Sequence, residues 1–186
     1  MGIFVLLACG KGEVMKSNQT KTSNQLSSSK TATHTLTVYY SNSGTTATAA
    51  NQIHQLVGGD LLEFKLAPSY PDDYQTLTQV SKEQIDQDVH PAITNLPSLK
   101  KYQTILLGFP TWYHQPPMFI NTFFEQEDLK GQTVIPFTTS MSSSISESTP
   151  FLTKMAAGTD VILEKGFRAN DERVTKKYLQ KANLLK

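Results

Sequence analysis

The chain has 186 residues and a formal net charge of +1, with 38% hydrophobic and 18% charged residues. This length fits one domain with a sizeable core, and this composition excludes a disordered chain and a multi-pass membrane protein. The near-neutral charge argues against a nucleic-acid-binding protein, because such proteins usually carry a basic excess.

The first 34 residues differ from the rest. Residues 3–9 form a short apolar run, far below the ~20 residues of a membrane-spanning helix. The polar tract that follows, rich in serine, threonine and lysine, cannot bury enough apolar surface to offset its ordering entropy. Residues 10–34 are therefore predicted to be a disordered tether in front of a domain over 35–186. Cys9 is the only cysteine, which excludes an intramolecular disulfide and a cysteine-based metal centre.

The order of apolar run, small residue, cysteine and tether resembles a bacterial lipoprotein signal. The resemblance implies that residues 1–9 are a signal segment, that Cys9 is lipidated, and that the protein is extracytoplasmic and held at a membrane by this anchor alone. No Lys or Arg lies between Met1 and Cys9, so the basic region of a secretory signal is missing. The alternatives are a true start upstream of Met1, or a frayed N-terminus with a chance cysteine on a cytoplasmic protein.

Strand-like and helix-like segments alternate from Thr35 onward. Residues 35–40 (TLTVYY) are β-branched and aromatic, which predicts a strand. After the polar turn 41–46, apolar residues recur at helical spacing until Gly58-Gly59 ends the helix. Residues 60–65 are predicted to be a second strand, and a polar helix is expected from about Asp73 to Asp88.

The second half continues the same alternation. Residues 104–109 (TILLGF) form a continuous apolar run, typical of a strand buried on both faces. Pro116-Pro117 opens a helix whose inward face is predicted to hold Phe119, Ile120, Phe123 and Phe124.

Two more strands and a helix are predicted after that. Residues 133–138 form a fourth strand, in which Pro136 favours a bulge or a strand end. Residues 160–163 give a short fifth strand. Asp171 begins a last helix with Val174, Tyr178, Ala182 and Leu185 facing inward. Alternating βα units predict an α/β fold with a parallel sheet, helices on both faces and a ligand site at the carboxyl ends of the strands.

The loop after the first strand is a candidate phosphate site. Backbone amides and hydroxyls at a helix N-terminus can surround a phosphate, and Gly44 permits a tight turn. The absence of lysine and of a Gly-Lys-Ser/Thr or GxGxxG motif excludes a triphosphate or dinucleotide loop, so a phosphate monoester is favoured. An ordinary turn with a hydroxyl N-cap is the alternative. The candidates are Ser41, Asn42, Ser43, Gly44, Thr45 and Thr46.

Two further loops follow strands at the same predicted edge. The first offers large flat apolar faces for stacking, unless Trp112 only packs against helices as a lid. Its candidates are Pro110, Thr111, Trp112, Tyr113 and His114. The second can hydrogen-bond the polar edge of a ring, unless it is only a flexible serine loop. Its candidates are Thr139, Ser140, Met141, Ser142 and Ser143.

Together the loops resemble the flavodoxin-like family. One branch carries a Tyr-Ser-x-Ser-Gly-x-Thr opening, a Tyr-Pro-x-x-Tyr segment, a Gly-x-Pro-x-Trp-Trp loop, and a Val-Ile-Pro-Phe strand ahead of Thr-Ser-Gly-Gly-Ser-Gly. The matching segments are residues 40–46, 70–74, 108–113 and 134–140. Four motifs in this order make the resemblance specific, and it covers residues 35 to about 184.

The resemblance implies a three-layer fold with a five-stranded parallel sheet of order 2-1-3-4-5 and an FMN cofactor. The first loop would hold the phosphate, Trp112 and Tyr113 would flank the isoalloxazine ring, and residues 139–143 would border its polar edge. The chain departs from the family where Met141-Ser142-Ser143-Ser144 replaces Gly-Gly-Ser-Gly. Glycine there would allow close backbone approach, so flavin affinity is in question.

The expected function is that of an FMN-binding redox protein that transfers one or two electrons, as an electron carrier or a small oxidoreductase. The flavin supplies the chemistry, so no catalytic side chain and no metal are predicted, and the partner is a redox protein or a small-molecule acceptor. The alternative is a degenerate flavodoxin fold that serves as a binding or scaffold module without flavin. A receiver or a hydrolase is disfavoured because no carboxylate ends the first or third strand.

Overall fold

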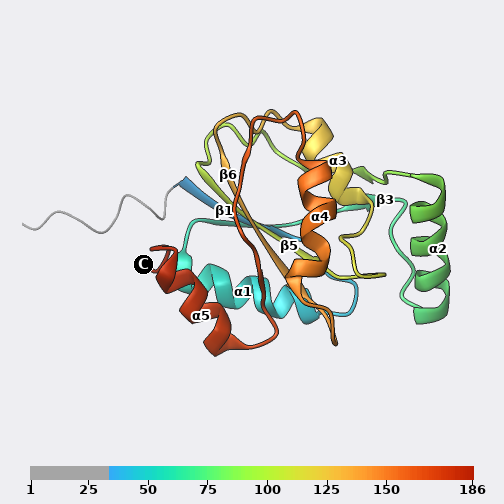
Figure 1. Ribbon diagram of the computed structural model, residues 1–186, viewed down its shortest axis with the longest axis horizontal. Coiled ribbons are helices and arrows are strands. Elements are labelled where there is room, and N and C mark those ends of the chain that lie inside the picture. The colour runs from blue at the N-terminus through green and yellow to red at the C-terminus, as the bar shows by residue number, and fades with distance from the viewer. Residues whose placement is uncertain (1–33) are drawn as a thin grey trace, which may run out of the picture.

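The computed structural model describes residues 34–186 (Figure 1). The predicted signal segment with Cys9, and the tether up to residue 33, lie outside the described residues. Within 34–186, no helix is both long and apolar enough to cross a membrane.

A parallel sheet forms the centre of the domain, in the order β2-β1-β5-β6-β7, with β8 pairing the other part of the same edge of β6. Its strands are β1 (Thr35–Tyr39), β2 (Asp60–Glu63), β5 (Thr104–Pro110), β6 (Thr133–Thr139), β7 (Ile162–Leu163) and β8 (Phe167–Arg168). The predicted order 2-1-3-4-5 is confirmed, with β7 and β8 together in the place of the fifth strand.

Helices cover both faces of this sheet (Figure 1). They are α1 (Thr45–Val57), α2 (Tyr74–Gln87), α3 (Phe119–Gln126), α4 (Ile145–Met155) and α5 (Glu172–Lys181). One buried cluster joins α1 and α5 to the sheet, and a second joins α2, α3 and α4 to the opposite face. All four apolar residues predicted for the inward face of α3 are buried. The molecule is therefore the predicted three-layer fold.

Four elements were not predicted from the sequence: β3, β4, α4 and β8. β3 (Leu66–Ala67) and β4 (Ala92–Ile93) pair antiparallel and bring the two ends of the α2 segment together. The helix α4 follows the serine-rich loop directly. Ser144 is its N-cap, and the Glu147 carboxylate accepts a 2.7 Å hydrogen bond from the Ser144 amide. This Ser-x-x-Glu spacing is a capping signature, so the sequence did carry a signal for α4.

The expectation that Pro136 marks a bulge or a strand end is wrong, because it lies inside the central strand β6. Val134 and Thr138 accept hydrogen bonds from Glu164 and Ala169 of the fifth-strand segment. Pro136, two residues from each, faces the same neighbour but has no N–H to donate. The fifth-strand segment is therefore interrupted opposite Pro136, and this interruption separates β7 from β8.

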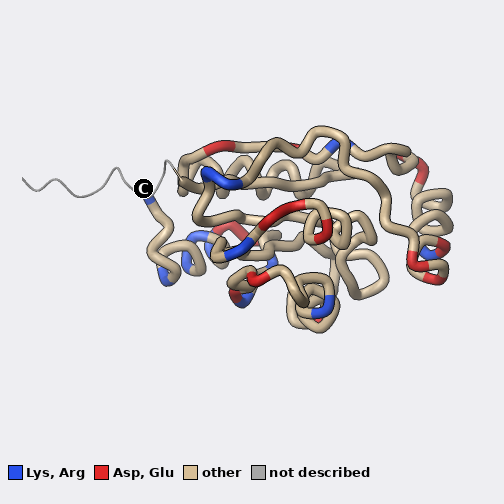
Figure 2. Tube along the Cα trace, turned by 90° about the horizontal axis from the view of Figure 1, so that it is seen from above, with Lys and Arg blue, Asp and Glu red and all other residues tan. Residues whose placement is uncertain are grey.

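The inward face of α5 also differs from the prediction. Thr175 and Leu179 are its buried residues, whereas Val174 is 51% exposed. Tyr178 and Leu185 are half-buried against the core as predicted, but Val174 and Ala182 are exposed, because the helix offers few apolar side chains to define an inward face. Figure 2 shows basic residues along α5 near the C-terminus, while charges of both signs are spread over the rest of the described chain.

Candidate functional site

The three predicted loops meet at the carboxyl edge of the sheet, and Thr139 joins them. Its hydroxyl lies 2.8 Å from the Thr46 hydroxyl, and its carbonyl accepts a 3.0 Å hydrogen bond from the Thr111 amide. A further bond of 2.6 Å links the hydroxyls of Thr111 and Thr138. Because β1, β5 and β6 are adjacent, their following loops form one site, as the topology predicts.

The loop after β1 leaves the N-terminus of α1 open. Gly44 is the N-cap with φ +84°, and no side chain caps the helix. The alternative of a hydroxyl-capped turn is therefore wrong. Ser43, Gly44 and Thr45 are exposed, and the Ser41 hydroxyl oxygen is buried without a hydrogen-bond partner among the described residues. Asn42 instead braces the loop, donating to the Pro71 carbonyl at 3.2 Å.

A hollow of about 520 Å³ lies beside this loop. Ser43, Gly44 and Thr45 line one side, and residues between β8 and the start of α5 line the other. Ala169, Asn170 and Glu172 form that second wall, which was not predicted from the sequence. Recognising residues 167–168 as a strand would have predicted it, since this segment follows the carboxyl end of β8.

The loop after β5 contains a strained two-residue turn. Trp112 and Gln115 exchange backbone hydrogen bonds, and the residues between them have left-handed φ values, +50° for Tyr113 and +64° for His114. Such turns normally use Asn-Gly, because larger side chains are strained at positive φ. Both side chains are tied down: Tyr113 donates to the Thr78 carbonyl at 3.0 Å, and His114 lies 2.6 Å from Glu147. The turn thus bridges α2 and α4.

Trp112 is half-buried over an aromatic cluster. Its ring meets Tyr70 edge-on at 4.8 Å and Tyr40 at 6.2 Å between centroids. Burial raises the pKa of Tyr40 to about 12 and raises that of Tyr70 as well, so both stay neutral hydrogen-bonding groups. Trp112 therefore packs as a lid on one edge while its remaining surface stays accessible.

The loop after β6 is ordered by hydrogen bonds rather than by glycines. The Ser140 hydroxyl accepts from the amides of Ser142 and Ser143 at 3.3 and 2.8 Å. The Ser140 amide donates to Asn170 at 3.0 Å, and Arg168 donates to the carbonyls of Ser140 and Met141. Met141 is fully exposed at the tip. The alternative of a loose serine loop does not fit these bonds.

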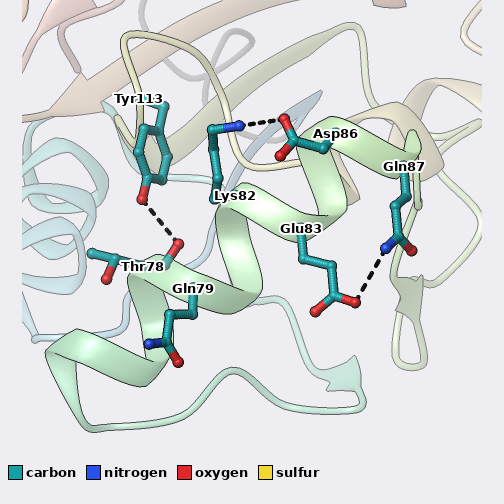
Figure 3. A pocket seen from close by; sticks show the side chains of 7 residues that line it. All are labelled: Thr78, Gln79, Lys82, Glu83, Asp86, Gln87 and Tyr113. Carbon is teal, nitrogen blue, oxygen red and sulfur yellow. Dashed lines mark hydrogen bonds and ion pairs between the residues drawn. The ribbon is translucent and has the colours of Figure 1, made fainter.

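A second hollow, of about 490 Å³, lies outside the strained turn (Figure 3). Tyr113 forms one side of it and points toward Thr78 of α2. The polar side chains on the α2 side pair with one another, Lys82 with Asp86 and Gln87 with Glu83. This hollow lies next to the site; its Lys82 and Asp86 charges neutralise each other, and the Glu83 carboxylate is held by the neutral Gln87 amide.

The hydrogen bonds of the Glu147 carboxylate predict a pH dependence of stability. The Ser144 amide, and then the His114 ring, hold the pKa of the Glu147 carboxyl below its usual value. The carboxylate therefore stabilises the fold above the ordinary glutamate pKa of about 4.3, and this contribution is lost as pH falls through the lower folded-state value. Denaturant unfolding at pH 7 and pH 3 should show a smaller acid loss in Glu147→Gln than in the wild type. Parallel losses in both proteins would contradict this assignment.

Comparisons with known proteins identify the family and the fold of the chain. A family model described as flavodoxin matches residues 34–182, so the chain belongs to the flavodoxin family. A solved structure from Bacteroides eggerthii, described as a flavoprotein, is 33% identical, covers 79% of this chain and 96% of its own, and has a TM-score of 0.68. Another from Bacteroides uniformis is 34% identical, with coverages of 80% and 99% and a TM-score of 0.68.

A flavoprotein from Lactobacillus acidophilus, solved in complex with FMN, is 24% identical to this chain. The match covers 76% of this chain and 97% of that one, with a TM-score of 0.63, and shows a shared fold. A comparison with curated proteins found no match.

Proposed function

We propose that the protein binds FMN noncovalently at the carboxyl edge of β1, β5 and β6 and serves as a redox protein. The observation that carries this proposal is the joining of three loops through Thr139 beside the uncapped N-terminus of α1. Family membership and the FMN complex of the Lactobacillus acidophilus protein support it. When bound, FMN accepts and donates one or two electrons.

The loop after β1 fits a phosphate monoester. The uncapped N-terminus of α1 offers backbone amides and a favourable dipole, and Gly44 presents open space where a side chain would stand. The buried Ser41 hydroxyl lacks a partner among the described residues, which is costly unless a ligand or water satisfies it. Ser43, Thr45 and Thr46 add hydroxyl donors. Trp112 and Tyr113 would contact the ring, and residues 139–143 would border its polar edge.

The alternative, a binding or scaffold module without flavin, rests on one observation. In flavin-binding relatives of this type we expect backbone amides of the glycine-rich loop to approach the ring closely. Here the Ser140 hydroxyl already occupies the amides of Ser142 and Ser143. Ligand binding at this loop must therefore use side-chain hydroxyls or displace these bonds.

One titration separates the two functions. Purified protein is stripped of ligand and titrated with FMN while flavin absorbance and fluorescence are recorded. A saturable change with one site per chain supports the redox protein, and a reductive titration then shows whether the bound flavin takes up electrons. Failure to load FMN under conditions where the protein is folded would favour the scaffold module.

The Trp112 ring provides a test of the ring site. Trp112→Ala is expected to weaken FMN binding by about 1–3 kcal/mol, comparable to aromatic stacking on a nucleobase, and to reduce quenching of flavin fluorescence. Trp112→Phe is the matched variant, since a smaller ring keeps part of the contact with Tyr70 and should fall between the two. Equal affinity and equal quenching in all three proteins would remove Trp112 from the site.

A further inference from the structure

Arg168, at the end of β8, is a cation without an acidic partner beside the loop after β6. Its side chain is half-buried. The ion pairs of residues 34–186 do not include it, although Arg173, the other arginine of this part, is paired. Asp171, three residues away, caps α5 and pairs with Arg173, and neither Glu164 nor Glu172, each four residues away, forms an ion pair with Arg168.

Neutral oxygen atoms hold this cation in place. One terminal nitrogen, Nη2, donates to the carbonyls of Ser140 and Met141 at 2.6 and 2.9 Å. Nε donates at 3.0 Å to the Asn170 side-chain oxygen, which also accepts the Ser140 amide at 3.0 Å. Both backbone groups of Ser140 are thus fixed, the carbonyl by Arg168 at the end of β8 and the amide by Asn170 just after it. A half-buried charge without a counter-ion is screened less than a fully exposed charge and is not cancelled by a partner, so it acts electrostatically on a group bound against the loop.

We propose that Arg168 is a positioning residue that replaces the missing glycines in shaping the 139–143 loop, and that its unpaired charge raises the reduction potential of bound FMN. The inference rests on the proposed function, because it concerns the polar edge of that cofactor. Flavin gains negative charge on reduction, and a nearby cation favours the more negative state. The two roles are separable, since Asn170 shapes the same turn without carrying charge.

Three variants separate the role of Arg168 in holding the loop from the effect of its charge on bound FMN. Arg168→Met removes the bonds and the charge, Arg168→Lys keeps the charge but cannot form the same fork of bonds, and Asn170→Ala removes only neutral bonds. The unloaded proteins are compared by thermal unfolding and by proteolysis of the loop. The loaded proteins are compared by the dissociation constant of oxidised FMN and by the midpoint potential at fixed pH.

We expect Arg168→Met to weaken binding of reduced FMN about tenfold more than binding of oxidised FMN, which equals a fall of about 30 mV in a two-electron potential. Arg168→Lys should keep the wild-type potential, and Asn170→Ala should loosen the loop and weaken both redox forms equally. If Arg168→Met does not fold, Arg168→Gln, which retains a hydrogen-bond donor, takes its place.

Two results would overturn the inference in distinguishable ways. An unchanged potential in Arg168→Met, with equal weakening of both redox forms, would reduce Arg168 to a purely structural contact. A folded wild-type protein that binds no FMN would overturn the proposed function. The proposed effect of the Arg168 charge on the reduction potential would then be wrong as well.

Discussion

Replacing Gly44 with valine is expected to weaken FMN binding about ten- to a hundred-fold. Gly44 has φ +84°, a conformation that costs a β-branched residue about 1–3 kcal/mol. A Cβ atom there would meet no atom within 4 Å, so the expected cost comes mainly from the backbone conformation. Relaxation of this strain would turn the first amides of α1 away from the phosphate, and about 1.4 kcal/mol corresponds to each tenfold loss of affinity.

Gly158 offers a matched control for this change. It has φ +82°, and a side-chain carbon at this position would also meet no atom within 4 Å, but Gly158 follows α4, away from the three loops. Gly158→Val should therefore lower the free energy of unfolding by a similar amount and leave FMN affinity unchanged. FMN titration and denaturant unfolding of both variants provide the comparison. Equal affinities for Gly44→Val and the wild type would mean that this loop does not hold the phosphate.

Much of the fold was predictable because its signals are local. The continuous apolar run TILLGF is typical of a strand covered on both faces, and it forms β5 at the centre of the sheet. The turn residues at Gly58-Gly59 and the cap at Asp171 also predicted where α1 ends and α5 begins. The split of the fifth strand was not predictable in this way, because it results from the missing N–H of Pro136, a residue in another strand.

The candidate site likewise has a part that the sequence predicts, the three loops, and a part that it does not, the contacts that shape them. Position after a parallel strand was sufficient to select all three loops, since topology brings such loops to one edge. The contacts that shape them join residues far apart in sequence. Arg168 reaches the carbonyl of Ser140, and His114 reaches Glu147 on a helix that had not been predicted. No local pattern in the sequence reports such pairs.

Replacing Gly166 with alanine is expected to destabilise the protein by about 3 kcal/mol, at the upper end of the usual cost of overpacking. The new methyl carbon would lie 2.4 Å from the Pro136 carbonyl oxygen and 2.9 Å from Ile145 Cγ1. The first contact is with the backbone of a central strand, so it cannot be relieved by a rotamer change. Urea unfolding of the two proteins measures the difference.

A double variant identifies which contact matters. Ile145→Ala removes the side chain but leaves the Pro136 carbonyl, so Gly166→Ala should cost nearly as much in that background as alone. Recovery of stability in the double variant would show that Ile145, not the carbonyl, sets the requirement for glycine.

Gly166→Ala should also affect FMN binding. Gly166 lets the chain pass the point where Pro136 offers no donor, and two and four residues later Arg168 and Asn170 hold the loop after β6. Displacement of β8 would therefore weaken FMN binding in protein that is still folded, in parallel with Asn170→Ala. Wild-type affinity in folded Gly166→Ala would instead mean that the backbone adjusts within residues 164–166 and leaves β8 in place.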